Sequence, residues 1–174
     1  MTEWTPSEPL RRHMLTVETA MRAAARRAGE DEELWGLAGL LHDFDYERHQ
    51  TVPDHPVKGA EVLRAEGYPE PVIQAILGHA NETGVPRDTL MAKTLFAVDE
   101  LCGFLTAVAY VRPSKKIADV EVSSVKKKLK DKTFARGVNR DDIVQGAAEL
   151  GLDVDTLIAL VLADLQENAE NLGL

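Results

Sequence analysis

The stretch DEELWGLAGLLHDFDYE, residues 31–47, is the most informative part of the sequence. Its apolar residues recur at helical spacing: Leu34, Leu37, Ala38 and Leu41. Asp31 is suited to cap a helix that begins directly after it. The apolar run ends at His42 and Asp43, so an imidazole and a carboxylate stand side by side at its carboxyl end. We therefore predict a helix that brings two polar side chains to the edge of an apolar interior.

The segments on either side carry the same kind of signal. Ser7 is a suitable N-cap and Gly29 a stop for a helix over residues 10–28. Caps, breakers and apolar periodicity predict further helices over residues 54–66, 69–80, 88–111, 122–130 and 140–150, and a last one from residue 153 onward. Residues 117–122 are the only candidate strand. The predicted fold class is all-α, a single-domain helical bundle over residues 1–174.

Composition narrows the range of functions. A hydrophobic content of 44% is that of an ordinary globular protein. One cysteine, Cys102, excludes an internal disulfide, and we expect it to be a buried apolar side chain. The sequence carries no secretory signal and no apolar run of membrane-spanning length, so we expect a cytoplasmic protein with no membrane partner. The net charge of −9 argues against general nucleic-acid binding.

The charge is unevenly distributed along the chain. Residues 112–140 contain ten basic and three acidic side chains, a local charge of +7. A basic patch on an acidic protein suits a small anionic ligand or a partner surface better than a long duplex. The sequence leaves the choice between these two open.

Four further residues suit the same chemistry as the His42–Asp43 pair: His13, His55, His79 and Asp99. His79 ends an apolar helix, and Asp99 interrupts the apolar run of another. A carboxylate in such a run is costly unless it is paired or bound to a cation. His49, in a polar stretch, is more typical of a surface residue. The set predicts a site for divalent metal, with Mn, Fe, Mg, Zn, Co and Ni not distinguished.

The order of these residues resembles the HD-domain superfamily of metal-dependent phosphohydrolases, of the HDIG type, over roughly residues 10–110. His13 matches the family's first histidine, His42 and Asp43 its doublet, and Asp99 its last aspartate. The resemblance implies that these four hold the first metal. For a second metal it implies that Asp43 bridges and that His55 and His79 complete the ligand shell. The chain departs from some two-metal members in having Ala80 after His79, where they have a second histidine.

The resemblance also implies roles in catalysis. Asp43, His55 and His79 are the expected catalytic residues, and with one metal only, the two histidines would face the substrate phosphate. Asp45 and Glu47 are acid/base candidates, although a solvated loop is the preferred interpretation of both. Beyond the part that carries the resemblance, six basic side chains are candidates to neutralise the substrate phosphate, although a solvated surface charge is the preferred interpretation of any single one: Lys115, Lys116, Lys126, Lys127, Lys128 and Arg136.

The expected function is that of a metal-dependent phosphohydrolase acting on a small phosphorylated metabolite or nucleotide through metal-activated water. Two alternatives stay open. One is a di-iron oxygenase of the HD type, and the other is a non-catalytic nucleotide-binding module. Homo-oligomer formation is also left open.

Overall fold

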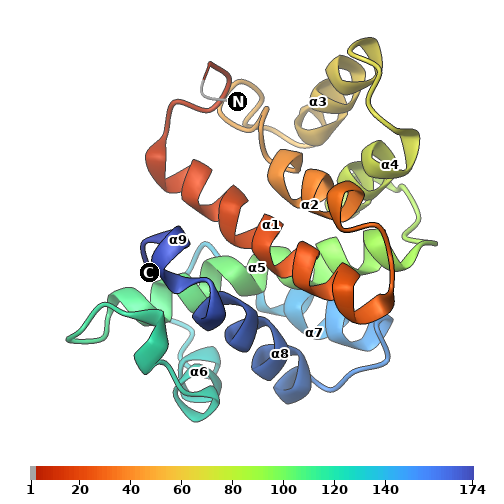
Figure 1. Cartoon of the computed structure of the whole chain (residues 1–174). Helices are drawn as coiled ribbons and strands as arrows, with labels where there is room; N and C mark the ends of the chain where they lie inside the picture. The colour runs from red at the N-terminus through yellow and green to blue at the C-terminus, as the bar shows by residue number, and fades with distance from the viewer. Residues whose placement is uncertain (1–2) are drawn as a thin grey trace. The chain divides into compact units, whose positions relative to one another are not determined.

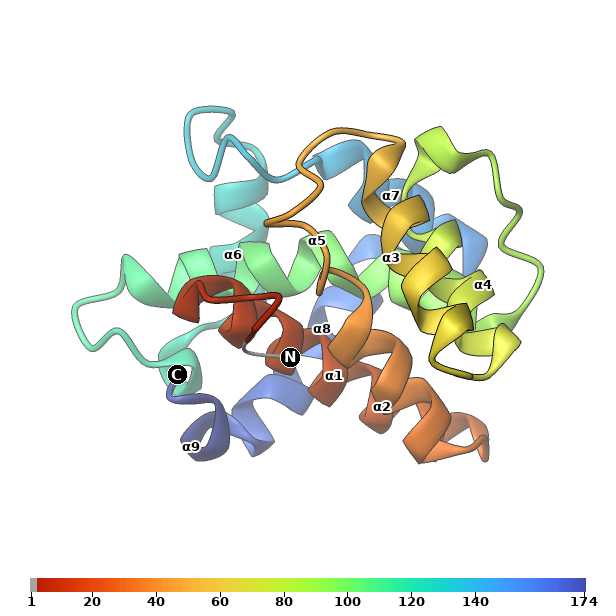
Figure 2. The ribbon, with the colours of Figure 1, turned by 90° about the horizontal axis from the view of Figure 1, so that it is seen from above.

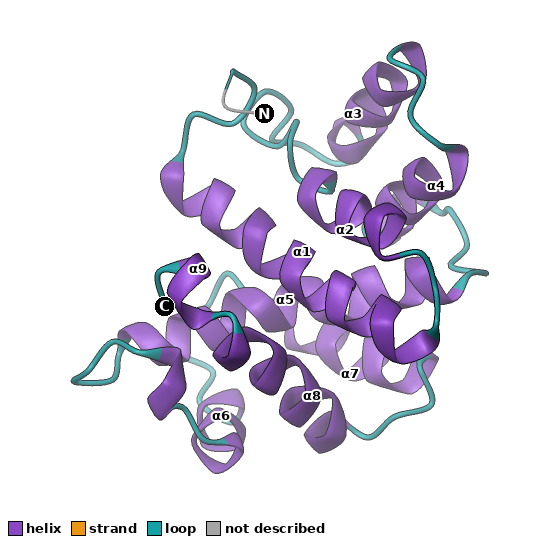
Figure 3. Ribbon diagram, in the orientation of Figure 1, coloured by secondary structure: helices purple, strands orange, loops and turns teal. Residues whose placement is uncertain are grey.

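The structure, a computed structural model, describes residues 3–174, and these residues form helices and loops with no strand (Figure 3). The all-α prediction is confirmed. The α-helices are α1 (Glu8–Ala28), α2 (Glu32–Leu41), α3 (Asp54–Ala65), α4 (Glu70–Gly78), α5 (Leu90–Tyr110), α6 (Val122–Leu129), α7 (Arg140–Glu149), α8 (Val154–Glu167) and α9 (Ala169–Leu172). Two 3-10 helices are η1 (Asn81–Thr83) and η2 (Ile117–Asp119).

The chain divides into two compact units, one up to Phe96 and one from Ala97 to Leu174. The first unit holds α1 to α4, η1 and the beginning of α5. The second holds the remainder of α5, η2 and α6 to α9. The single-domain organisation expected from the sequence stays a prediction.

In the first unit, α1 and α2 lie against each other (Figure 1). The Ser7 side chain accepts a hydrogen bond from the Leu10 N–H and begins α1, and Gly29 ends it with a φ of 71°. Gly39 permits the close approach of the two helices, because a Cβ there would lie 2.8 Å from the Cα of Glu18. Helix α4 packs against both α2 and α3, and α3 and α4 are seen side by side in Figure 2.

Apolar side chains from these helices fill the interior of the first unit. Among the fully buried ones are Met14, Val17, Met21, Ala38, Val72, Ile73 and Ile76. Their burial supplies the main driving force for helix packing, at about 25 cal/mol per Å² removed from water. His42 and His79 follow directly at the carboxyl ends of α2 and α4, next to this apolar interior.

In the second unit, α8 packs against α6, α7, α9 and η2. The side chains of Asn139 and Asp153 cap α7 and α8. Gly146 lets α7 approach α5 closely, since a Cβ there would lie 2.5 Å from the Cα of Ala97. The buried side chains at the centre include Leu101, Phe104, Leu105, Ile117, Ile143, Ile158 and Leu165.

The candidate strand at residues 117–122 is wrong. Residues Ile117–Asp119 form the 3-10 helix η2 instead. The side-chain amide of Gln166 donates hydrogen bonds to the carbonyls of Ile117 and Val120. These carbonyls are therefore satisfied by a side chain of α8 and not by a neighbouring strand. The short helix α9 was not predicted.

No helix within residues 3–174 combines the length and the apolar character that crossing a bilayer requires.

Candidate metal centre

His42 and Asp43 follow the last residue of α2. His42 is fully buried, and its Nδ1 lies 2.8 Å from the carbonyl oxygen of Gly39. A carbonyl can only accept, so Nδ1 carries a proton, and Nε2 presents a lone pair whenever the ring is neutral. Nε2 is therefore the nitrogen atom through which this ring would bind a metal ion.

His13 reaches the same place from α1. Its Nε2 lies 3.2 Å from Nε2 of His42, and the two rings meet edge to face with centroids 5.1 Å apart. Its side chain keeps 22% of its exposure, while that of His42 keeps none. His13 therefore stands on the solvent side of this pair of histidines.

His55 comes from the start of α3, where its φ of −83° and ψ of 131° depart from helical values. Its Nδ1 lies 2.7 Å from Oδ1 of Asp45, and its Nε2 lies 3.1 Å from Oδ1 of Asp43. The ring is thus held between two carboxylates. Tyr46 packs edge to face on it, with ring centroids 5.2 Å apart.

His79 stands at the carboxyl end of α4. Its Nδ1 donates to the carbonyl of Ile76 at 2.5 Å, which leaves Nε2 free to bind, as in His42. The Arg87 guanidinium donates to the neighbouring carbonyl of Gly78 and lies over the ring of Phe96. These contacts hold the carboxyl end of α4 in place.

The Asp43 carboxylate lies at the centre of the four histidines, with each oxygen facing one pair of rings. Oδ1 lies 3.1 Å from Nε2 of His55 and 3.6 Å from Nε2 of His79. Oδ2 lies 3.4 Å from Nε2 of His42 and 3.8 Å from Nε2 of His13. Carboxylate oxygens and imidazole nitrogens that converge in this way suit a divalent cation. Asp43, His55 and His79 alone already form a three-ligand group.

The electrostatics of the metal-free site reflect this crowding. Burial raises the pKa of Asp43, but the charge of His42 and hydrogen bonds from His42, His55 and His79 outweigh it and hold that pKa well below 3.8. Burial lowers the pKa of His55, and hydrogen bonds to Asp43 and Asp45 raise it by more, to about 9. Protons thus hold together in the metal-free protein the same atoms that a cation would bind.

Two residues near the doublet differ from the preferred interpretation of the sequence. Asp45 does not lie in a solvated loop: it is fully buried and bonded to His55 and to the backbone N–H of Gly59. Glu47 accepts a hydrogen bond from the backbone N–H of Ser7 and so ties the doublet turn to the start of α1. Neither carboxylate stands free as an acid or base. The local sequence, a polar stretch, carries no sign of this burial.

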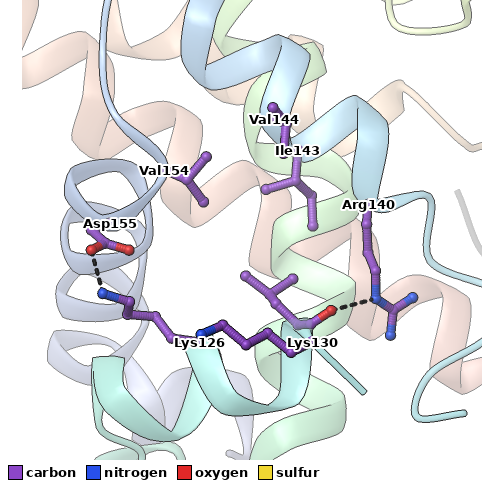
Figure 4. A pocket seen from close by; sticks show the side chains of 8 residues that line it. Lys126, Lys130, Arg140, Ile143, Val144, Val154 and Asp155 are labelled. Carbon is purple, nitrogen blue, oxygen red and sulfur yellow. Dashed lines mark hydrogen bonds and ion pairs between the residues drawn. The ribbon is translucent and has the colours of Figure 1, made fainter. Parts of the chain in front are cut away.

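The remaining predicted residues lie in the second unit. Asp99 stands on α5. The six basic residues belong to the part of the sequence that follows α5 and precedes α7, and three of them are on α6: Lys115, Lys116, Lys126, Lys127, Lys128 and Arg136. Lys126 pairs with Asp155 at the rim of a cavity of about 230 Å³ (Figure 4). The ammonium group of Lys128 lies 4.6 Å from the centre of the Phe134 ring. Cys102 is buried, as expected.

The loop between α6 and α7 is held by one side chain that the sequence did not single out. The guanidinium of Arg140 donates hydrogen bonds to five backbone carbonyls, those of Leu129, Asp131, Phe134, Ala135 and Val138. Figure 4 labels Arg140, and the dashed line that ends on its side chain marks one of these hydrogen bonds. Part of the basic segment is thus structural.

Comparison with known proteins bears on the metal centre directly. The family model of the HD domain matches residues 10–103, which include His13, the His42–Asp43 pair and Asp99. The chain belongs to the HD-domain family. Members of this family are mostly metal-dependent hydrolases, and HD domains bind divalent metal ions. No solved structure matches the chain.

Proposed function

We propose that this HD-domain protein is a metal-dependent phosphohydrolase that acts on a small phosphorylated metabolite or nucleotide. The observation that carries the proposal is the division of the Asp43 carboxylate between two pairs of histidines. The proposal assigns one cation position to each side of this shared carboxylate. Asp99 completes the ligand set of the His13–His42 side in this proposal, as the family pattern implies.

The residues of the first unit have separate tasks. His42, His55 and His79 are held by hydrogen bonds at Nδ1, so their Nε2 atoms are oriented before any cation binds. Asp43 supplies negative charge to both sides. A bound divalent cation supplies Lewis acidity and lowers the pKa of a coordinated water, the usual source of hydroxide at neutral pH.

We propose that the substrate reaches the site from the side of His13. His13 and Asp43 keep 22% and 15% of their side-chain exposure, whereas His42 and His55 are almost fully enclosed. In the proposal, the phosphoryl group approaches past His13, and the basic residues between α5 and α7 neutralise its charge. Among the three consecutive lysines, Lys126 pairs with Asp155 and Lys128 lies near the Phe134 ring, whereas Lys127 is exposed and makes neither kind of contact within the described residues, so it is the best candidate for this task.

The test has two steps. Metal content is measured on the purified protein, and a panel of phosphorylated metabolites and nucleotides is then assayed for phosphate release with that metal added. Release of phosphate that stops on chelation and returns with the metal supports the proposal. Oxygen consumption with bound iron would favour the oxygenase instead. Tight nucleotide binding without turnover would favour a binding module.

A further inference from the structure

Asp45 is a buried carboxylate with a specific pair of partners. Its Oδ1 accepts from Nδ1 of His55 at 2.7 Å and its Oδ2 accepts from the backbone N–H of Gly59 at 2.8 Å. The side chain is 1% exposed. Burying an ionised carboxylate is costly unless hydrogen bonds compensate, and both oxygens here have one. Asp45 thus reaches from the turn after α2 to the first two turns of α3.

His55 depends on such a contact more than the other histidines do. It stands within α3 but outside helical geometry, so the helix does not by itself set the direction of its ring. In His42 and His79 the Nδ1 proton is held by backbone carbonyls within their own helices. In His55 it is held by the side chain of a residue ten positions earlier. The orientation of this ring is therefore encoded by a second residue.

Gly59 makes the contact sterically possible. A Cβ at this position would lie 2.6 Å from Cγ of Asp45 and 2.7 Å from its Oδ2. A side chain at position 59 would push the Asp45 carboxylate away from both of its hydrogen-bond partners. The Asp45 carboxylate therefore keeps its two hydrogen bonds only because residue 59 has no side chain.

We propose that Asp45 is a positioning residue of the metal centre: with Gly59, it fixes the ring of His55 and thereby the Asp43–His55–His79 cation position. The inference rests on the proposed function, because it assigns a partner to one side of the proposed centre. Asp45 does not touch the cation. It holds the proton on Nδ1 of His55, which leaves Nε2 as the ligand atom, 3.1 Å from Asp43.

Asp45→Asn tests this with little change of shape. Asparagine has one acceptor oxygen where aspartate has two. If that oxygen accepts from Gly59, its NH₂ group faces Nδ1 of His55, and the ring must carry its proton on Nε2. If the amide is reversed, its NH₂ group faces the Gly59 N–H, donor against donor. Either arrangement disturbs the His55 side of the centre and leaves the His13–His42 side untouched.

Gly59→Ala is the second variant, because it displaces the same carboxylate and keeps its charge. Glu47→Gln is the matched control: it removes a carboxylate charge two residues away whose partner is the Ser7 backbone and no histidine. All proteins are loaded with ¹¹³Cd²⁺ and studied by cadmium NMR, and equilibrium dialysis gives the affinity of each ion.

We expect two cadmium resonances in the wild type and in Glu47→Gln. In Asp45→Asn and in Gly59→Ala, the ion at Asp43–His55–His79 should bind about 10- to 100-fold more weakly, while the other resonance is retained. In a His55→Ala background, Asp45→Asn should change the remaining ion no further. If Asp45→Asn fails to fold, the comparison of Gly59→Ala with the control decides.

The outcomes separate this inference from the proposed function. A wild-type protein that binds no cadmium, and no other divalent ion, contradicts the proposed function and removes this inference with it. A wild type that binds its ions normally, with equal affinities in Asp45→Asn and Gly59→Ala, contradicts the role of Asp45 alone. Equal weakening of both ions would assign Asp45 a general structural role and overturn the proposal.

Discussion

The Nε2 atoms of His13 and His42 lie 3.2 Å apart. Two imidazole nitrogens at this distance repel each other if both present lone pairs, because neither has a proton to share. Nε2 of His42 presents one whenever its ring is neutral, since its Nδ1 donates to Gly39. The contact therefore requires a proton on one of the two Nε2 atoms or a cation beside the pair, and Oδ2 of Asp43 lies 3.4 Å from Nε2 of His42. A divalent cation held by these two nitrogens would remove the repulsion without a proton.

Asp43→Ala is expected to remove every bound ion together with activity. This carboxylate faces all four histidines, so its loss takes a negative ligand from both sides of the centre. Metal analysis and phosphate release on the same preparation check this. Glu66→Ala, an exposed carboxylate at the end of α3, is the control and should retain both. Full metal content in the Asp43 variant would place the site elsewhere.

His55→Ala and His79→Ala are expected to distinguish one bound metal from two. In a centre with two ions, each substitution should lower the ratio of metal to protein while the ion on the His13–His42 side stays bound. In a centre with one ion on that side, the ratio should stay constant and only kcat should fall. Elemental analysis with steady-state kinetics checks this. If both variants kept full kcat and metal, the pair would have no role.

The sequence predicts the helices well, but it does not predict the hydrogen bonds that hold the candidate metal-binding side chains. The reason is how far apart in the sequence the interacting residues lie. Helix caps at Ser7, Asp31, Asn139 and Asp153 act on residues two or three positions away, so a local pattern reveals them. The histidines stand at the ends of apolar runs, which is also a local signal. Five of the six predicted metal-binding residues are found together in the first unit, while Asp99 lies in the second.

Contacts between residues that lie ten or more positions apart in the sequence leave no such local pattern. The bonds of Asp45 to His55 and Gly59 span ten and fourteen residues. From the sequence, Asp45 belongs to a polar stretch, and the prediction is a solvated side chain. The ion pair between Lys126 and Asp155 spans 29 residues. The sequence therefore predicts candidate metal-binding residues, and it misses the contacts that hold His55 and that pair Lys126 with Asp155.

The stability of the metal-free protein is expected to depend on pH through His55. Its pKa is raised from 6.5 to about 9, so its contribution to folding is complete below pH 6.5 and is lost as the pH rises through 9. The pKa of Asp43 is depressed, so its contribution is present above pH 3.8 and is lost only as the pH falls. The difference in Tm between the wild type and His55→Gln, measured with a chelator present, should shrink from pH 6.5 to 9. A constant difference would contradict this.

Metal binding should have the opposite dependence over the same range. A cation takes the Nε2 atom that the proton occupies, so affinity should rise with pH by up to about tenfold per unit until pH 9. Titration calorimetry in two buffers with different ionisation enthalpies measures the released proton. In His55→Gln the protons released on binding should be fewer, and an unchanged number would assign the proton to another group.

Lys127→Gln is expected to raise KM with little effect on kcat or metal content, if the basic segment binds substrate phosphate. Loss of uniform binding leaves kcat nearly unchanged, and the effect should diminish as salt screens the charge. Lys126→Gln is the control, because the Lys126 ammonium already pairs with Asp155. Steady-state kinetics at low and high salt check this. An unchanged KM at low salt would assign Lys127 to solvent or to a contact with another chain.

Gly39→Ala is expected to destabilise the protein and to weaken metal binding together. A Cβ at this position would lie 2.8 Å from Cα and 2.9 Å from N of Glu18, and backbone atoms of α1 cannot move aside as a flexible side chain can. Overpacking of this kind costs about 1–3 kcal/mol. The Gly39 carbonyl also accepts the hydrogen bond of His42, so a shift of α2 should move this ring away from its partners.

Urea unfolding and metal titration measure the two effects. Gly137→Ala, where a Cβ meets nothing within 4 Å, is the control and should change neither. A stable Gly39→Ala protein with weakened metal binding would separate ring orientation from helix packing, whereas an unchanged protein would show that α1 and α2 can move apart without cost.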